Sequence, residues 1–419
     1  MKTFNRANIL IPHNIDYTKW SVVACDQYTS EPEYWAEVEK TVGESPSSLH
    51  IIYPEIYLNE KNKEERIKNI NQKMKKYLDE GIFKEYKDSL ILVERTQRNG
   101  KKRYGLIGQV DLEDYDFSKG STSKIRATEG TVIERIPPRV KIRENAPLEI
   151  PHIIMLIDDP DLTVIEPLKN QKDNFEVLYD FELQMNSGHL KGYLINDDSS
   201  DSALKAIDSF ADENTFYNKY NLKKSVLQFA VGDGNHSLAT AKTCWENIKK
   251  SLTDEEKKTH PARFALVEVM NIHDPSLEFE PIHRFVYNIN PENLLKAFIE
   301  FYPEASYSDN GGRKIDYCHK EACGSIYINN APSNLAVGTL GKFLDAYLKE
   351  NGGDIDYIHG KSTVEKLAQK DNSIGFILPS MEKKQLFETV ILDGSLPRKT
   401  FSMGEAEDKR FYFECKNIQ

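Results

Sequence analysis

The clearest chemical pattern in the sequence is a glycine-rich turn between a strand and a helix. The apolar run Val226–Val231 leads into Gly232-Asp-Gly-Asn-His-Ser237, and the segment 238–250 that follows has helical spacing. Such a turn points free backbone N–H groups at the space above the helix start, where the helix dipole favours an anion. Gly232 and Gly234 let the backbone approach a ligand closely. The turn predicts an anion site, and an ordinary turn with a helix cap is the alternative.

Three polar residues of this turn carry groups that can act on a phosphate. Asp233 is a candidate catalytic acid or base and the candidate metal ligand, and Asn235 and His236 are candidates to donate hydrogen bonds to phosphate oxygens. Ser237 adds a hydroxyl group at the helix start. The turn is not a Walker A loop, because no Gly-Lys-Ser/Thr follows, and it lacks the last glycine of Gly-x-Gly-x-x-Gly.

A second candidate is the basic stretch 124–143, which has six Lys or Arg residues and two Glu residues in a chain of net charge −11. Arginine side chains bind phosphate or carboxylate groups through two parallel hydrogen bonds. Glu129 is a candidate general base for an attacking hydroxyl group. A solvated charged surface is the alternative interpretation. The arginines predicted to bind phosphate or substrate are Arg126, Arg135 and Arg139.

Two basic pairs later in the chain are further candidates for anion binding. His283 and Arg284 follow a proline, and Arg398 and Lys399 lie in a loop that begins with Leu396-Pro397. A structural role is the alternative for both pairs. Near the start of the chain, Asp26 is either a catalytic or metal-binding carboxylate or part of a turn.

The cysteines favour neither a disulfide framework nor a zinc site. There are five, an odd number, and only Cys318 and Cys323 are close in sequence. No second Cys/His pair at zinc spacing accompanies them. We therefore expect no disulfide framework and a reducing, cytoplasmic location. Cys25 is either a nucleophile or a buried residue at a strand end.

Mixed helical and strand patterns are expected to position these residues. Strands at 89–94 and 104–112 flank an Asn99-Gly100 turn and predict a hairpin, and Ser30 is expected to cap a helix that begins at Pro32. Further strands are predicted at 153–157, 226–231, 264–270, 325–328 and 374–378. Further helices are predicted at 63–80, 202–212, 238–250, 294–301, 340–349 and 382–391. The pattern indicates an α+β protein with a larger unit at 1–287 and a smaller α/β unit at 288–419, whose terminal loop returns to the site.

Composition limits the function. The chain has 419 residues, 55 of them Lys or Arg and 66 Asp or Glu, and 39% are hydrophobic. This acidic balance argues against a nucleic-acid partner, because phosphate neutralisation needs clustered cations. No apolar run approaches the length of a membrane span, and no secretion signal is expected. The sequence leaves open whether the chain forms a homo-oligomer.

Several short segments together resemble the prokaryotic family called domain of unknown function ten-fifteen. These segments are Asp233–Ser237, Glu280–Phe285, Asp356–Gly360, Gly375–Pro379 and Leu396–Phe401. The family is similar to the ParB/sulfiredoxin-like group, which includes free-serine kinases. The resemblance therefore implies a ParB/sulfiredoxin-like core and phosphorylation of free L-serine to O-phospho-L-serine, with pyrophosphate as donor.

The sequence departs from that family at two positions of the turn. The family's usual Asp-Gly-His-His-Arg is Asp-Gly-Asn-His-Ser here, with Asn235 at the first histidine position and Ser237 at the arginine position. One phosphate-binding fork is therefore missing, and a nucleotide is an alternative donor. We expect Mg²⁺ as the charge-neutralising cofactor. A phosphoserine phosphatase and a non-catalytic nucleotide-binding regulator remain the alternative functions.

Overall fold

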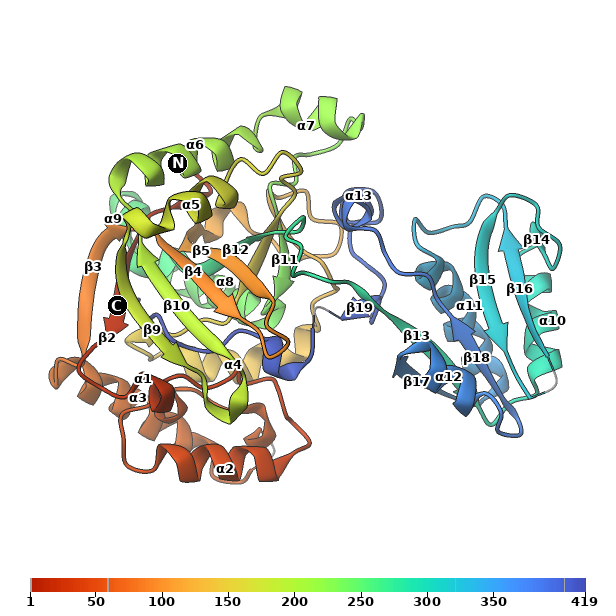
Figure 1. Cartoon of the computed structure of the whole chain (residues 1–419), viewed down its shortest axis with the longest axis horizontal. Helices are drawn as coiled ribbons and strands as arrows, with labels where there is room; N and C mark the ends of the chain where they lie inside the picture. Colours follow the sequence, from red (N-terminus) through yellow and green to blue (C-terminus); the bar gives the residue numbers. More distant parts are fainter. Residues whose placement is uncertain (1, 59, 321, 403) are drawn as a thin grey trace. The chain divides into compact units, whose positions relative to one another are not determined.

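The computed structural model divides the chain into two compact units, each of which is described by itself (Figure 1). Unit 1 consists of Met1–Leu277 and Glu405–Gln419, and unit 2 is Glu278–Gly404. Unit 2 is therefore inserted between two parts of unit 1, whereas the sequence placed a single boundary at residue 287. The residues that the structure describes are 2–58, 60–320, 322–402 and 404–419.

Unit 1 is built around a nine-stranded mixed sheet. Its order is β6-β11-β8-β12-β5-β4-β10-β9, and β1 also pairs with β5. The strands of this sheet are β1 (Phe4–Asn5), β4 (Ile91–Thr96), β5 (Lys102–Asp111), β6 (Ile125–Ala127), β8 (Ile154–Ile157), β9 (Glu176–Glu182), β10 (His189–Leu194), β11 (Phe229–Asp233) and β12 (Phe264–Asn271). Two short two-stranded sheets accompany it, made of β2 (Ala7–Pro12) with β3 (Phe83–Ser89) and of β7 (Leu148–Glu149) with β20 (Lys416–Asn417).

Both faces of the large sheet are covered, because alternate residues of its strands belong to different cores. Leu92 and Leu106 pack with residues of α5, α6 and α8, whereas Val93 and Ile107 pack with residues of α2, α3 and 411–415. Burial on both faces explains why β12, with the sequence FALVEVMN, is nearly continuous in apolar residues. The helices of unit 1 are α1 (Tyr17–Trp20), α2 (Pro32–Val42), α3 (Lys63–Asp79), α4 (Ile136–Arg143), α5 (Ile165–Gln171), α6 (Asp197–Ser209), α7 (Glu213–Tyr220), α8 (Asn235–Ile248) and α9 (Asp254–Thr259).

Unit 2 contains a seven-stranded sheet and four described helices. The sheet order is β14-β16-β15-β18-β13-β17, and β19 also pairs with β13. Its strands are β13 (Glu280–Tyr287), β14 (Ala305–Ser306), β15 (Arg313–Cys318), β16 (Cys323–Ile328), β17 (Asp354–His359), β18 (Ser373–Ile377) and β19 (Phe401–Ser402). Its helices are α10 (Pro291–Phe301), α11 (Ala336–Asn351), α12 (Lys361–Leu367) and α13 (Lys383–Asp393).

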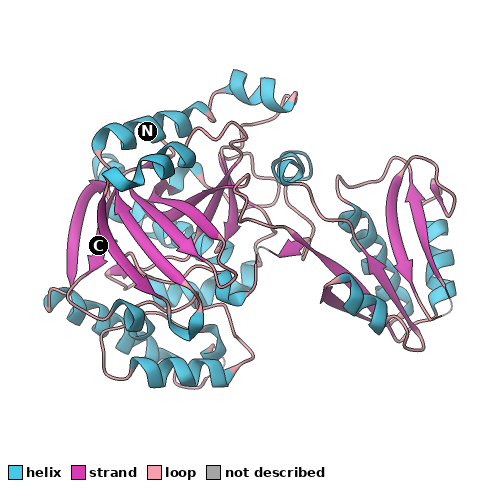
Figure 2. Cartoon of the chain, viewed as in Figure 1, coloured by secondary structure: helices cyan, strands magenta, loops and turns pink. Residues whose placement is uncertain are grey.

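The structure confirms the predicted α+β class, since both units mix helices and strands (Figure 2). The hairpin around Asn99-Gly100 forms as β4 and β5, and the predicted helices all form within a few residues of their expected bounds. None of the described helices combines the length and the hydropathy of a membrane span.

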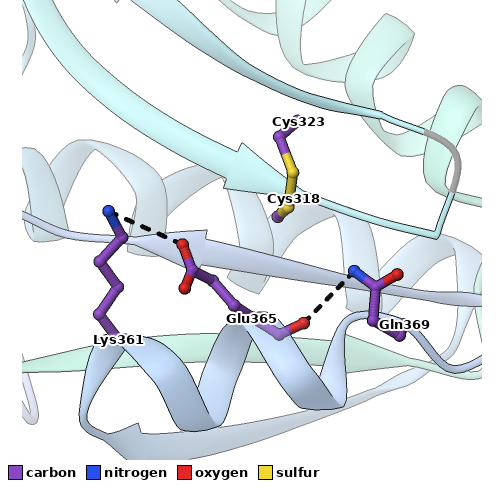
Figure 3. Close-up of a disulfide and its surroundings, with 5 residues drawn as sticks. All are labelled: Cys318, Cys323, Lys361, Glu365 and Gln369. Atoms are coloured by element: carbon purple, nitrogen blue, oxygen red, sulfur yellow. Dashed lines mark hydrogen bonds and ion pairs between the residues drawn. A yellow bond between two sulfur atoms is a disulfide. The ribbon is translucent and has the colours of Figure 1, made fainter.

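Three local features differ from what the sequence indicated. Cys318 and Cys323 face each other where β15 ends and β16 begins, and they form a disulfide (Figure 3) that the expectation of no disulfide framework did not include. Glu31, not Ser30, is the N-cap residue of α2, because Pro32 already occupies the first helical position. β11 begins at Phe229 and continues through Asp233, so the strand reaches further into the glycine-rich turn than predicted.

Candidate functional site

The glycine-rich turn lies where β11 ends and α8 begins. β11 runs antiparallel to β8, with Asp233 opposite Ile154, so the carboxyl end of β11 meets the segment that leads into β8. Gly234 adopts a left-handed conformation, with φ at 75°, and a Cβ atom there would lie 2.9 Å from the backbone of Ile153. Only glycine fits this close approach without displacing the neighbouring chain. The free N-terminus of α8 therefore stands beside the start of β8.

Asp233 is a partly buried carboxylate with two defined partners. Its Oδ1 accepts a hydrogen bond of 2.8 Å from the backbone N–H of Gly234, and its Oδ2 lies 3.4 Å from Nζ of Lys409. Burial by itself raises the pKa of Asp233, but Lys409, His152 and the Gly234 N–H outweigh burial and hold the pKa below its usual value. Asp233 is therefore ionised at neutral pH.

His152, Tyr412 and Asp26 form a chain of polar contacts next to Asp233. The Tyr412 hydroxyl accepts a hydrogen bond from the backbone N–H of Cys25 at 3.2 Å and lies 2.7 Å from Nδ1 of His152. Burial raises the pKa of Tyr412 well above its usual value, so the hydroxyl stays protonated and donates a hydrogen bond to Nδ1 of His152. The other ring nitrogen of His152, Nε2, faces Oδ2 of Asp26 at 3.9 Å.

His236 on the first turn of α8 is a neutral hydrogen-bond donor. Burial and the charges of Arg139 and Arg135 lower the pKa of His236. Its Nε2 accepts a hydrogen bond of 3.3 Å from the backbone N–H of Val132, so the ring proton lies on Nδ1. The same turn holds Asn235, whose buried Oδ1 atom has no hydrogen-bond partner among the described residues. The start of α8 thus offers a donor and an unsatisfied acceptor to a ligand.

The residues that follow β6 lie alongside this turn. The backbone N–H and the hydroxyl group of Thr128 both donate to the carbonyl of Val231, at 3.3 and 2.7 Å. Glu129, the predicted general base, follows directly and is half-buried. Arg139 on α4 forms an ion pair with Glu55, and Arg135 precedes α4. The charges of Arg135 and Arg139 act on His236, so the structure brings both arginines near the turn, and Glu129 follows Thr128 in the chain. Their catalytic and binding roles stay predictions.

Arg126 has a different place in the fold. It is only 5% exposed, and its guanidinium donates to the backbone carbonyls of Ser123, Ser225 and Val226 at 2.8 to 3.0 Å. These bonds tie the start of β6 to the segment before β11. Because its guanidinium is bonded to these carbonyl groups, Arg126 stabilises the fold and does not face a ligand.

The four basic residues predicted later in the chain belong to unit 2. Arg284 is buried and donates to the carbonyls of Arg398 and Lys399, both at 3.0 Å, and burial lowers its pKa to about 10. His283 accepts a hydrogen bond from the Leu378 N–H at 3.1 Å through Nδ1. These contacts bind the loop of Arg398 and Lys399 to β13 within unit 2.

Sequence reasoning missed three residues of the site, namely His152, Lys409 and Tyr412. Lys409 and Tyr412 come from residues 405–419, here called the C-terminal segment, which returns to unit 1 after unit 2. One sequence pattern could have indicated that this segment packs on unit 1, namely the alternation of apolar and polar residues at 410–415. Phe411, Phe413 and Cys415 of this pattern enter the core. The partners of Arg410, Tyr412 and Glu414 are polar.

Buried arginines hold the C-terminal segment in place. Arg95 and Arg103 donate to the carbonyls of Glu407 and Asp408, at 2.8 and 2.9 Å, immediately before Lys409. Arg410 donates to Glu268 at 2.8 Å, to the Pro151 carbonyl at 3.1 Å and to Glu414. Because its flanking residues are fixed on both sides, Lys409 is held beside Asp233.

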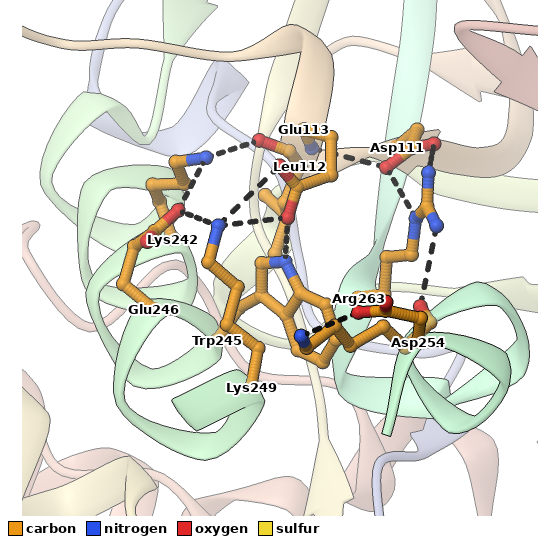
Figure 4. Close-up of polar contacts among 10 residues, drawn as sticks. Asp111, Leu112, Glu113, Lys242, Trp245, Glu246, Lys249, Asp254 and Arg263 are labelled. Atoms are coloured by element: carbon orange, nitrogen blue, oxygen red, sulfur yellow. Dashed lines mark hydrogen bonds and ion pairs between the residues drawn. The ribbon is translucent and has the colours of Figure 1, made fainter. Parts of the chain in front are cut away.

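A second network fixes the far end of α8 (Figure 4). Glu113 accepts hydrogen bonds from the indole N–H of Trp245 and from Lys249, and Lys242 donates to the Leu112 carbonyl at 2.9 Å. Trp245 is fully buried. The helix that carries His236 at its start is therefore anchored through its last turns.

The donor set fits a magnesium ion only if a phosphate ligand completes it. Among the residues that the structure describes, no three His, Cys, Asp or Glu side chains form a group that could hold a metal ion. Mg²⁺ often binds one or two protein carboxylates together with substrate phosphates and water. Asp233 can be such a single ligand, because each of its oxygens has one partner and retains a free lone pair.

The comparisons place the chain in a family whose function is unknown. The model of the family described as Protein of unknown function (DUF1015) matches residues 10–388, and the chain belongs to this family. No curated protein matches the chain.

Three similar solved structures share 10 or 11% of their residues with this chain. The first is a free serine kinase in complex with AMP, with a TM-score of 0.37; the match covers 73% of this chain and 90% of that one. The second is SbnI with a C-terminal truncation from Staphylococcus aureus, with a TM-score of 0.34 and coverage of 73% of this chain and 82% of that one. The third is a conserved hypothetical protein from Pyrococcus furiosus, with a TM-score of 0.34 and coverage of 74% of this chain and 94% of that one. Similarity at this level carries no functional argument.

Proposed function

We propose that the protein is a phosphotransferase that moves a phosphoryl group from pyrophosphate to the hydroxyl group of free L-serine and forms O-phospho-L-serine. The observation that supports this most is the start of α8, where the neutral donor His236 and the free helix N–H groups stand beside the Asp233–Lys409 pair. Phosphoryl transfer depends mainly on positioning and on neutralising charge, and this arrangement offers both.

In the proposed reaction the serine oxygen attacks the terminal phosphorus of pyrophosphate. A new P–O bond forms to serine, the bridging P–O bond breaks, and inorganic phosphate leaves. Asp26 is the proposed base that takes the hydroxyl proton, because its Oδ2 faces Nε2 of His152, which orients the carboxylate. Glu129 is the second candidate base, as the sequence suggested. Lys409 and His236 would contact the phosphoryl oxygens.

Mg²⁺ would arrive with the phosphate donor and neutralise part of its charge, with Asp233 as its protein ligand. Lys409 shares that task, because its ammonium group already faces Asp233.

Serine and pyrophosphate come from the family resemblance, and the geometry supports only the phosphate part of the proposal. A nucleotide is the alternative donor, because the turn lacks one phosphate-binding arginine fork at position 237, so nucleotides belong among the donors to be tested. The C-terminal segment supplies Lys409, a cation beside Asp233, in a turn that lacks the family's usual arginine at position 237.

The test is an assay of the purified protein with L-serine, Mg²⁺ and pyrophosphate, ADP or ATP, followed by ³¹P NMR for phosphoserine. Pyrophosphate should give phosphoserine and phosphate in equal amounts. Product from a nucleotide alone would change the donor, and hydrolysis of added phosphoserine would reverse the direction. A thermal shift with nucleotide but no product would identify a binding protein instead.

Asp233→Asn should reduce turnover at least 100-fold, since it removes the charge that Lys409 and the metal ion need. Asp161→Asn is the matched control, because Asp161 is an exposed carboxylate in a loop of the same unit. Full activity in the Asp233 variant would refute the site.

A further inference from the structure

Unit 1 contains a cavity away from the glycine-rich turn. It has a volume of about 540 Å³ and lies between α3, the end of α2 and residues 49–57. This volume is in the range of sites for small organic ligands. Its apolar wall includes Ile52 and Ile70, which are 6 and 5% exposed.

Arg66 and Lys73 both line this cavity, and they differ in their partners. Among the residues that the structure describes, no Asp or Glu side chain forms an ion pair with Lys73, whose ammonium group stands 5.5 Å from the centre of the Tyr77 ring. Arg66, by contrast, is already paired with Glu60 at 3.0 Å and packs over the Tyr57 ring at 4.2 Å. Lys73 is thus the cation that remains available to a ligand.

His50 adds a hydrogen-bond donor to the same cavity. Its Nδ1 lies 2.9 Å from the Tyr77 hydroxyl, whose other acceptor, the Ser47 carbonyl, is at 3.4 Å. The hydroxyl therefore donates to Nδ1, and a neutral His50 carries its proton on Nε2. Burial and the charge of Lys73 lower the pKa of His50, so the ring is neutral.

We propose that this cavity binds a small carboxylate with an apolar body. The carboxylate would lie between Lys73 and the Nε2–H of His50, and the apolar body would cover Ile52 and Ile70. A singly charged carboxylate suits the site better than a dianionic phosphate, because Lys73 offers it a single positive charge and Glu39 and Glu65 also line the cavity.

Glu55 links the cavity wall to the candidate active site. Pro54 and Tyr57 line the cavity, and Glu55 between them donates its N–H to the Cys25 carbonyl at 2.8 Å. The Glu55 carboxylate also holds Arg139, whose charge acts on His236. A ligand that fixes residues 54–57 therefore changes the positions of Arg139 and of the residues next to Asp26. This regulatory consequence rests on the proposed function, whereas binding does not.

Calorimetric titration of the whole protein with phenylacetate tests the site. Phenylacetate should bind, and 2-phenylethanol, which has the same ring without the charge, should bind at least tenfold more weakly. Lys73→Gln should weaken phenylacetate about tenfold, as expected for one charged hydrogen bond. Lys75→Gln, which removes an exposed lysine from the same helix, should leave the affinity unchanged.

Three results would overturn the site: no phenylacetate binding at millimolar concentration, equal losses in the two lysine variants, or tighter binding of phenyl phosphate than of phenylacetate. Tryptophan fluorescence unfolding of both variants shows that any loss of binding is not a loss of folding.

Coupling is tested by titrating inorganic phosphate with and without saturating phenylacetate. The phosphate affinity should change at least twofold in the wild type and not in Glu55→Gln, which should still bind phenylacetate. An unchanged phosphate affinity in the wild type would refute the coupling. A protein that binds phenylacetate but no phosphate would refute the proposed function and leave the carboxylate site standing.

Discussion

Replacing Lys409 by methionine should destabilise unit 1 in a way that depends on pH. Lys409 and Asp233 lie 3.4 Å apart, with side chains that are 19 and 16% exposed. The variant keeps the unbranched apolar stem of the side chain and removes its charge. Asp233 then stays buried without its main cation, and burial, which raises its pKa, is no longer outweighed.

The size of the effect follows from the geometry. Two unit charges 3.4 Å apart attract by about 5 kcal/mol at an effective dielectric constant of ~20. Part of this attraction offsets the cost of removing both groups from water, and breaking a buried pair typically costs ~3–5 kcal/mol. Because both side chains retain some exposure, we expect a loss of about 3 kcal/mol in the free energy of unfolding at pH 7.

The stability lost in the variant should depend on pH, because the pKa of Asp233 differs between the wild type and the variant. A carboxyl group whose pKa is lowered by folding contributes stability above its unfolded pKa of ~3.9, and this contribution is lost as the pH falls through the folded pKa. In the variant, the pKa of Asp233 is raised, so protonation relieves the unpaired charge. The difference between wild type and variant should therefore shrink as the pH falls from 7 to 4.

Urea unfolding followed by tryptophan fluorescence is the assay. All three tryptophans, Trp20, Trp35 and Trp245, belong to unit 1, so the signal reports this unit. A double-mutant cycle with Asp233→Asn should give a coupling energy of about 2–3 kcal/mol at pH 7. A coupling energy near zero, or a loss that is the same at pH 7 and pH 4, would refute the ion pair as the cause.

Three further variants test other parts of the structure. Glu113→Gln should lower the free energy of unfolding by about 1 kcal/mol at pH 7, because it removes the partly exposed ion pair with Lys249. Trp245 and Lys249 lower the pKa of Glu113 against the effect of burial. Urea titrations should therefore show that the extra stability of the wild type vanishes as the pH falls through that pKa. Tyr412→Phe should cost about 2 kcal/mol in the same assay, because the Cys25 N–H and Nδ1 of His152 lose their partner in a buried place. Replacing Cys318 and Cys323 by serine should lower the stability of unit 2 by about 2 kcal/mol, measured by hydrogen exchange, and leave the tryptophan transition of unit 1 unchanged.

The sequence predicted those parts of the fold that local patterns determine. The hairpin of β4 and β5 followed from apolar runs around an Asn-Gly turn, and α3 and α8 followed from helical spacing. The glycine-rich turn was predicted as a site because its residues are contiguous, and in the structure Asp233 ends β11 and His236 lies in the first turn of α8.

The rest of the site depends on contacts between distant parts of the chain. His152 and Tyr412 are 260 residues apart in sequence and 2.7 Å apart in space, and no local pattern relates them. Arg126 shows a second limit of prediction from sequence. An arginine that binds backbone carbonyl groups and one that binds phosphate look the same in a sequence. Only the fold decides which groups the guanidinium meets.

The order of synthesis gives the inserted position of unit 2 a consequence for biogenesis. A ribosome that has finished Leu277 must make all of Glu278–Gly404 before Lys409 exists. At ~5–20 residues per second this takes about 6–25 s. During that interval Arg95, Arg103 and Glu268 have been made but lack their partners from residues 407–410. The nascent chain therefore passes through a period in which buried charged groups of unit 1 lack the partners that the C-terminal segment supplies.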